Sequence, residues 1–127
     1  MTINKSVDIE NEVRNALISF QTVYCRPLPA EYDLPNILVT QVGGTDSQTI
    51  DTFEVVLDSR AEVDAEAIDY LNTAIAILKT AAKEQKTGLR RVTVITSGSW
   101  GADPVRPDLA MCSARLAIVA HQISMEV

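Results

Sequence analysis

The sequence contains few cysteine and histidine side chains, which many nucleophilic and metal sites require. Its 127 residues include two cysteines and one histidine. Cys25 and Cys112 stand far apart and form neither a CxxC pair nor a metal-ligand spacing, so we expect free thiols in a reducing compartment. The single histidine, His121, has no neighbouring motif that indicates a catalytic role. We therefore predict that the protein is not an enzyme and uses no metal or cofactor.

Long apolar segments and positive charge are also missing. No apolar run is longer than residues 116–120, which have the length of a strand, whereas a membrane-spanning helix needs about 20 apolar residues. Acidic residues outnumber basic residues by 17 to 11, which gives a net charge of −6. Phosphate contacts need clustered Lys and Arg, so this balance argues against sequence-specific nucleic-acid binding. The N-terminal residues contain no apolar signal core, which predicts a protein that is intracellular at synthesis.

Two short glycine-containing segments match known catalytic loops only in part. Residues 43–47 lack the Lys-Ser/Thr ending of a phosphate-binding loop, and this composition favours a turn. Residues 97–101 lack the first glycine of the G-x-S-x-G nucleophile elbow. They contain Trp100, the only tryptophan, which is equally compatible with a core position and with an interface anchor.

Charge is distributed unevenly along the chain. Acidic side chains concentrate between residues 46 and 69, without the D-x-D-x-D-G spacing of a calcium loop. A basic stretch follows, formed by Lys79, Lys83, Lys86, Arg90 and Arg91. These segments are either ordinary solvated patches or complementary surfaces through which copies meet head-to-tail and close a ring.

The chain has the length of one domain, residues 1–127. Apolar residues at helical spacing predict two helices, and alternating apolar and polar residues predict three strands. The helices span residues 6–22 and 64–86, and the strands span residues 36–42, 48–58 and 89–97. The final segment fits either a helix or a strand, and we favour a strand from about residue 111. The order α-β-β-α-β-β predicts an α+β fold, with a mainly antiparallel four-stranded (or five-stranded) sheet packed against two helices.

The order and spacing of these segments resemble the small tail terminator proteins of long-tailed bacteriophages, also called tail completion or minor tail proteins. The similarity begins with Leu-Pro-x-Ile-x-Val at residues 34–39, followed by Gly43 and Gly44. It continues through Asp51 with the strand at 53–58, the alanine-rich helix at 65–82, the strand leading into residues 97–98, the loop at 103–104, and Arg115 before residues 116–119. The resemblance covers roughly residues 7–123.

This resemblance implies an α/β sandwich that assembles into a hexameric ring at the head-proximal end of the phage tail. The ring stops tube polymerisation and joins the tail tube protein to the head–tail connector protein. The protein is then part of the virion, is assembled in the host cytoplasm, and contacts neither a membrane nor specific nucleic-acid sequences. The candidate interface residues are Gly43, Gly44, Asp46, Asp51, Arg90, Arg91, Trp100 and Asp103.

Two other classes of function stay open on the sequence. One is a different phage neck protein, such as a head-completion or connector subunit. The other is a small ligand-binding or enzymatic α+β domain that uses Cys25, Cys112 or His121.

Overall fold

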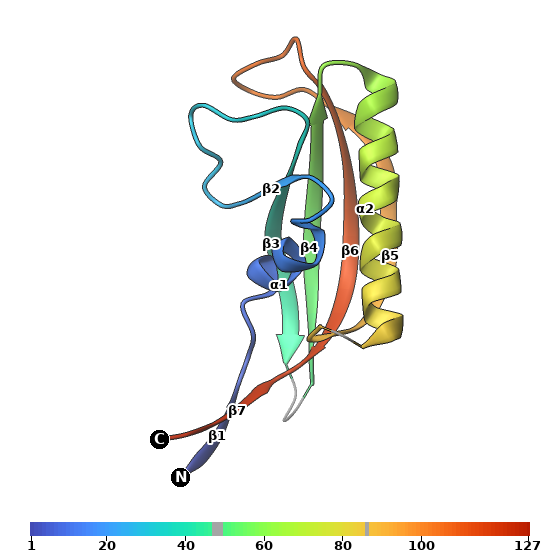
Figure 1. The fold of residues 1–127 in the computed structure, drawn as a ribbon. Coiled ribbons are helices and arrows are strands. Elements are labelled where there is room, and N and C mark those ends of the chain that lie inside the picture. Colours follow the sequence, from blue (N-terminus) through green and yellow to red (C-terminus); the bar gives the residue numbers. More distant parts are fainter. Residues whose placement is uncertain (47–49, 86) are drawn as a thin grey trace.

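The structure is a computed structural model that describes residues 1–46, 50–85 and 87–127, except for the side chain of Asp46. Its elements follow in the order β1 (Thr2–Lys5), α1 (Ile9–Leu17), β2 (Thr22–Cys25), β3 (Asn36–Asp46), β4 (Ile50–Ala61), α2 (Asp64–Glu84), β5 (Leu89–Gly101), β6 (Ala110–His121) and β7 (Ile123–Glu126). Five strands form one sheet in the order β2-β3-β4-β6-β5, and β1 pairs with β7 in a separate ribbon. Figure 1 shows the ribbon projecting from the body, with both termini at its tip.

The predicted fold class is wrong in the number of strands and in the type of sheet. The described chain has seven strands and two helices in the order β-α-β-β-β-α-β-β-β, and its five-stranded sheet is mixed because β2 runs parallel to β3. The three missed strands, β1, β2 and β7, each have four residues. An alternation of apolar and polar residues is hard to recognise over so short a segment.

The first helix is also shorter than predicted. The prediction was too long because the helical spacing of apolar residues continues past the end of the helix. α1 is capped by Asp8, whose Oδ1 accepts a hydrogen bond from the backbone N–H of Asn11 at 3.3 Å. The helix ends at Leu17, whose carbonyl accepts the N–H of Phe20 in the following turn at 2.9 Å. Phe20 packs on Tyr70 of α2 with ring centroids 5.6 Å apart, so its burial comes from α2 and not from a longer α1.

The central elements were predicted more closely. The antiparallel β3–β4 hairpin, the long helix α2 and the strand β5 lie close to where they were expected, and the final segment is confirmed as a strand. The turn predicted from residue 43 is wrong up to Asp46, because β3 continues through these residues and pairs with β4. α2 ends at Glu84, and Gln85 adopts a left-handed conformation (φ 55°) that returns its N–H to the carbonyl of Ala81. The predicted helix end at Lys86 and the predicted strand start at Gln48 lie outside the described residues.

Both helices cover the same face of the sheet (Figure 1). α1 packs on β2 and β3, α2 packs on β4, β5 and β6, and the two helices contact each other. Alternate residues of β4 and β6 supply the buried layer beneath them, among them Val55, Leu57, Leu116 and Ile118. The opposite face of the sheet carries partly exposed polar side chains, as is common for largely antiparallel sheets. In the part of the chain that the structure describes, neither helix is long and apolar enough to cross a membrane.

Candidate functional site

The ribbon formed by β1 and β7 is the first candidate surface, and we call it the arm. Its strands pair antiparallel, with Ile3 opposite Met125 and Lys5 opposite Ile123, and the N–H of Val127 reaches the carbonyl of Met1 at 2.9 Å. Two-stranded ribbons of this size are at best marginally stable in water by themselves. An arm that projects from the body is therefore expected to gain stability by packing on another surface.

The arm has one apolar face and one polar face. Residues paired across an antiparallel ribbon share a face, and successive residues along each strand alternate between faces. Ile3, Ile123 and Met125 consequently share one face, which extends to Met1 and Val127 at the tip and includes Lys5 beside Ile123 at the base. Ile123 is 47% exposed and Met125 is 38% exposed. The polar face is formed by the Thr2–Glu126 and Asn4–Ser124 pairs.

Asp51 fixes the base of the arm. Its side chain is 2% exposed and accepts a hydrogen bond from Ser6 Oγ at 2.5 Å, just after β1. It also accepts one from Gln122 Nε2 at 2.8 Å, between β6 and β7. One carboxylate on β4 therefore holds both chains where they leave the body. Asp51 was predicted as an interface residue, and the structure gives it a role in orienting the arm.

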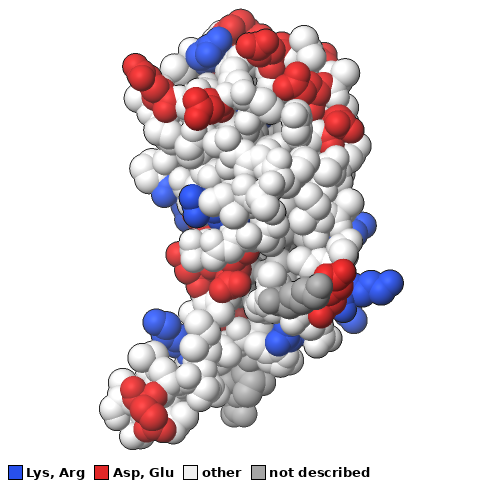
Figure 2. Space-filling view, viewed as in Figure 1, with Lys and Arg blue, Asp and Glu red and all other residues white. Residues whose placement is uncertain are grey.

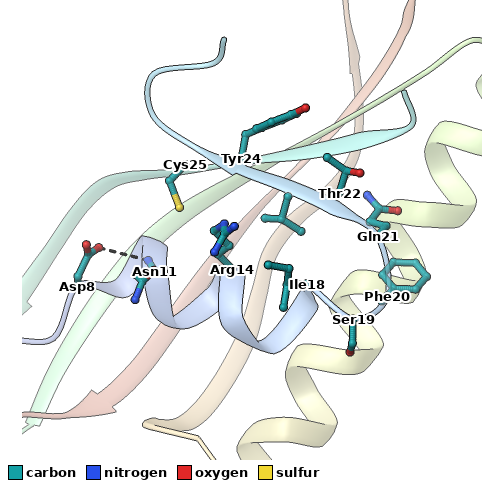
Figure 3. Close-up of a pocket in the computed structure, with 11 residues that line it drawn as sticks. Asp8, Asn11, Arg14, Ile18, Ser19, Phe20, Gln21, Thr22, Tyr24 and Cys25 are labelled. Carbon is teal, nitrogen blue, oxygen red and sulfur yellow. Dashed lines mark hydrogen bonds between the residues drawn. The ribbon is translucent and has the colours of Figure 1, made fainter. Parts of the chain in front are cut away.

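The second candidate surface is a hollow of about 690 Å³ between α1 and β2, which we call the α1–β2 hollow. Its walls include Arg14 and Ile18 from α1 and the turn after it, together with Cys25 from β2. Figure 3 shows Arg14 and the sulfur of Cys25 pointing into the space between these two elements. Ile18 is 49% exposed. β2 is the outermost strand of the sheet, so its outer edge faces this hollow without a neighbouring strand in the described chain.

An amide with unmet hydrogen-bonding capacity lies in the wall of the hollow. Both polar atoms of the Gln21 side chain, Nε2 and Oε1, are buried and have no hydrogen-bond partner within the described residues. Leaving a buried polar group unpaired costs about 1–3 kcal/mol, and such groups are rare in folded proteins. The Gln21 amide is thus suited to pair with a donor and an acceptor that arrive from outside the chain.

Glu10 joins the hollow to the rest of the sheet. Its carboxylate accepts hydrogen bonds from Arg26 Nη2 at 2.6 Å, Arg26 Nε at 2.9 Å and the backbone N–H of Gln41 at 3.0 Å. Burial by itself raises the pKa of Glu10, but these donors and the charge of Arg26 outweigh it and lower the pKa. Gln41 lies on β3 beyond the residues that pair with β2, so Glu10 satisfies an N–H that the sheet leaves free.

The thiol in the hollow is not an activated nucleophile. Burial raises the pKa of Cys25, and the negative charges of Glu10 and Asp8 raise it further, so the reactive thiolate is disfavoured. Cys112 is fully buried on β6, and burial raises its pKa as well. In the described ranges, His, Cys, Asp and Glu form no group of three or more placed to hold a metal ion.

The Cys–His pair that the sequence allowed is not brought together. β2, which carries Cys25, is three strand positions from β6, which carries Cys112, so about 14 Å of sheet separates these strands. His121 lies nine residues along β6 from Cys112, a distance of about 30 Å. Whether the protein is an enzyme is a separate question, on which our expectation stays a prediction.

The opposite end of the sheet is held together by Asp103, which was also predicted as an interface residue. Its side chain is 3% exposed and accepts a hydrogen bond from Arg60 Nε at 2.6 Å and one from the hydroxyl of Tyr32 at 3.2 Å. Its other oxygen accepts the backbone N–H groups of Val105 and Arg106. Burial raises the pKa of Asp103, but the Arg60 hydrogen bond and the two N–H donors outweigh it and bring the pKa to about 2. Asp103 thereby fixes the loop between β5 and β6.

The remaining predicted residues lie on β3 and β5. Gly44 is required by space, because a Cβ there would lie 2.6 Å from the carbonyl oxygen of Thr52, whereas Gly43 has room for one. Arg90 donates to the carbonyl of Thr87 at 3.0 Å, and Arg91 is exposed near the start of β5. Trp100 is 53% exposed near the end of β5. The side chain of Asp46 lies outside the described residues.

Charge separates along the length of α2. Its first turn contains Asp64 and Glu66, and its last turn contains Lys83. Figure 2 shows acidic side chains gathering over the end of the molecule where α2 begins. Asp64 and Glu66 therefore lie far from Lys83, whereas Asp51 lies at the basic end, because Asp51 and Leu89 both pair with Ala120 of β6.

The arm and the α1–β2 hollow were both missed by the sequence analysis. The signal for the arm is weak but present, because the segments MTIN and ISMEV each alternate apolar and polar residues. No sequence signal identifies the hollow, since it depends on where α1 ends and on which strand forms the edge of the sheet. Comparisons with models of known protein families and with curated protein sequences find no match.

Proposed function

We propose that this protein is a structural subunit of a bacteriophage neck: a tail terminator that forms a ring at the head-proximal end of the tail. In this role the ring caps the tail tube, contacts the tail tube protein on one side and receives the head–tail connector on the other. The protein acts through shape and surface contact, without a chemical reaction. The phage assignment comes from the sequence resemblance, and the ring assignment is supported by the arm.

The observation that carries this proposal is the exposed apolar face of the arm. Contiguous exposed apolar surface in a folded protein commonly marks an interaction site. The arm projects away from the body (Figure 1), Asp51 holds its base, and Ile123 and Met125 on its apolar face are exposed. A projecting arm differs from any surface on the body that receives it. Repeated contacts between unlike surfaces generate a closed ring when the rotation between subunits fits.

A second surface is available for the tube or the connector. β5 is the other outermost strand of the sheet and spans thirteen residues with one neighbouring strand, β6. Its register shifts three times against β6, and such irregularities discourage indiscriminate pairing along an open edge. Ile95 and Trp100 on this strand are 47% and 53% exposed. Tryptophan is strongly enriched among residues that dominate binding energy.

The proposal is tested by native mass spectrometry and negative-stain electron microscopy of the purified protein, alone and with its tail tube protein. We expect rings of six subunits. A protein that stays monomeric at high concentration and forms no ring beside the tube protein contradicts the proposal.

Particles that lack this protein distinguish a terminator from the alternative neck proteins. A missing terminator should give overlong polymerised tails, because nothing stops tube growth. Tails of normal length that fail to join filled heads would instead indicate a head-completion or connector subunit.

A further inference from the structure

We propose that the arm of one copy docks into the α1–β2 hollow of the next copy, with its apolar face inward and one of its strands along the free edge of β2. The inference rests on the proposed function for its occupant, a second copy of this chain. The arm and the α1–β2 hollow are then the two surfaces that meet at each contact in the ring.

The backbone of the arm matches the edge that receives it. β1, β7 and β2 each have four residues, and the outer edge of β2 has no strand beside it in the described chain. Addition of an extended segment to an exposed sheet edge is a common mode of protein recognition, in which main-chain hydrogen bonds provide much of the affinity. The β2 edge is short, so the contact also depends on the side chains beside it.

The side chains of the hollow suit the apolar face of the arm. Ile18 exposes apolar surface at the hollow, beside partly buried Phe20, and the arm exposes Ile123 and Met125. The unpaired Gln21 amide supplies a further reason for a strand to bind there. Both of its polar atoms are buried in the free chain, so the Gln21 side chain has to rotate into the hollow. A backbone N–H and C=O of the incoming strand can then pair with Gln21 Oε1 and Nε2, which removes an unsatisfied buried group.

One pair of charges on the two surfaces is complementary. The hollow contains Asp8, the N-cap of α1, and Arg14 in its last turn, six residues apart or about 9 Å along a helix axis. On the arm, Lys5 lies on the same face as Ile123 and Met125, whereas Glu126 lies on the opposite face. Docking with the apolar face inward therefore directs Lys5 into the hollow, where Asp8 can pair with it.

The contact forms between copies and not within one chain. Ser6 and Gln122 are both bound to Asp51, which directs the arm away from the body that carries it. Figure 1 shows the arm extending beyond the sheet, while α1 lies against the sheet. Folding the arm back onto its own hollow would break the hydrogen bonds at its base.

Two pairs of matched variants test the contact. Met125→Asp places a charge on the apolar face of the arm, and Ser124→Asp places the same charge on the polar face. Ile18→Asp places a charge in the hollow. Its control is Asn15→Asp, which places the same charge at an exposed position of α1 outside the hollow. We expect Met125→Asp and Ile18→Asp to raise the protein concentration needed for half-maximal assembly at least tenfold, because a carboxylate is costly to bury without a partner. The two controls should assemble within about twofold of the wild type. Equal behaviour of variants and controls overturns the inference.

Mixing the two defective variants provides a positive signal that also shows they are folded. In a 1:1 mixture, the intact arm of the Ile18→Asp chain can enter the intact hollow of the Met125→Asp chain. Native mass spectrometry should therefore detect a heterodimer that neither variant forms alone, and no ring. Absence of the heterodimer at concentrations where the wild type assembles contradicts the inference.

Failure of this inference can be told apart from failure of the proposed function. If the wild type forms rings and Met125→Asp forms them equally well, the docking inference is wrong and the ring proposal stands. If the variants and the mixture behave as expected but the wild type forms open chains, the docking inference stands and the terminator ring is contradicted. A wild type that never self-associates overturns both.

Discussion

Replacing Asp103 with asparagine is expected to destabilise the protein by about 3–5 kcal/mol, because it breaks a buried ion pair. Asp103 and Arg60 are 3% and 5% exposed, and their side chains meet at 2.6 Å. Removing one partner of such a pair leaves the other charge buried and uncompensated. Arg60 has little means of compensating, since its Nη1 is already buried without a hydrogen-bond partner among the described residues.

The pH dependence provides a second estimate of the same interaction. The pKa of Asp103 is lowered from 3.8 to about 2, and at about 1.4 kcal/mol per pH unit this stabilises the folded state by about 2.5 kcal/mol at neutral pH. Because the folded-state pKa is the lower one, this stabilisation is complete above about pH 4 and is lost as the pH falls toward 2. The side-chain amide of the Asp103→Asn variant cannot ionise, so the stability gap between wild type and variant should narrow over this range.

Urea denaturation followed by circular dichroism, at pH 7 and at steps down to pH 2.5, measures both effects. Asp108→Asn is the control, because Asp108 pairs with Arg106 at 3.2 Å on the surface, where such pairs contribute about 0–1 kcal/mol. A loss below about 1 kcal/mol for Asp103→Asn at pH 7, or a gap that stays constant with pH, would refute the reasoning.

Three further predictions concern other parts of the molecule. Gly44→Ala should lower the free energy of unfolding by about 1–3 kcal/mol, because a Cβ there meets backbone 2.6 Å away, while Gly43→Ala should change it far less; chemical denaturation checks both. Asp51→Ala should leave the sheet folded but speed hydrogen exchange of the arm amides at least tenfold, since it removes both hydrogen bonds at the arm base. Cys25 should react with iodoacetamide at pH 7.5 more slowly than a free thiol, and Cys112 should react after unfolding, as followed by mass spectrometry.

The parts of the fold that could be predicted are those with long periodic segments. α2 has 21 residues and β6 has 12, so their apolar patterns repeat often enough to be recognised. β2 has four residues, and its Tyr24 continues the helical spacing of the preceding segment, which extended the predicted helix past its true end. A parallel edge strand beside a hairpin gives no local signal, so the mixed sheet could not be foreseen.

The roles of the predicted interface residues also could not be read from the local sequence. Asp51 and Asp103 were predicted as interface residues from the resemblance to tail terminators, and both are buried. Their partners are distant in sequence: Ser6 is 45 residues from Asp51, and Arg60 is 43 residues from Asp103. Composition near each residue carries no information about such partners. Each residue holds a segment of the chain in place: Asp51 orients the arm, and Asp103 fixes the loop between β5 and β6.

Orientation of the arm decides what kind of assembly the proposed contact produces. An arm that enters a hollow joins two unlike surfaces. An open chain of copies therefore keeps one free arm at one end and one free hollow at the other until the ring closes. A flexible arm would allow many angles between neighbours and would give open chains of variable length. The buried Asp51 ties both strands of the arm to β4, and this restricts the angle. In the proposed ring, the number of subunits is therefore set at the base of the arm, whereas the affinity between subunits is set at its apolar face.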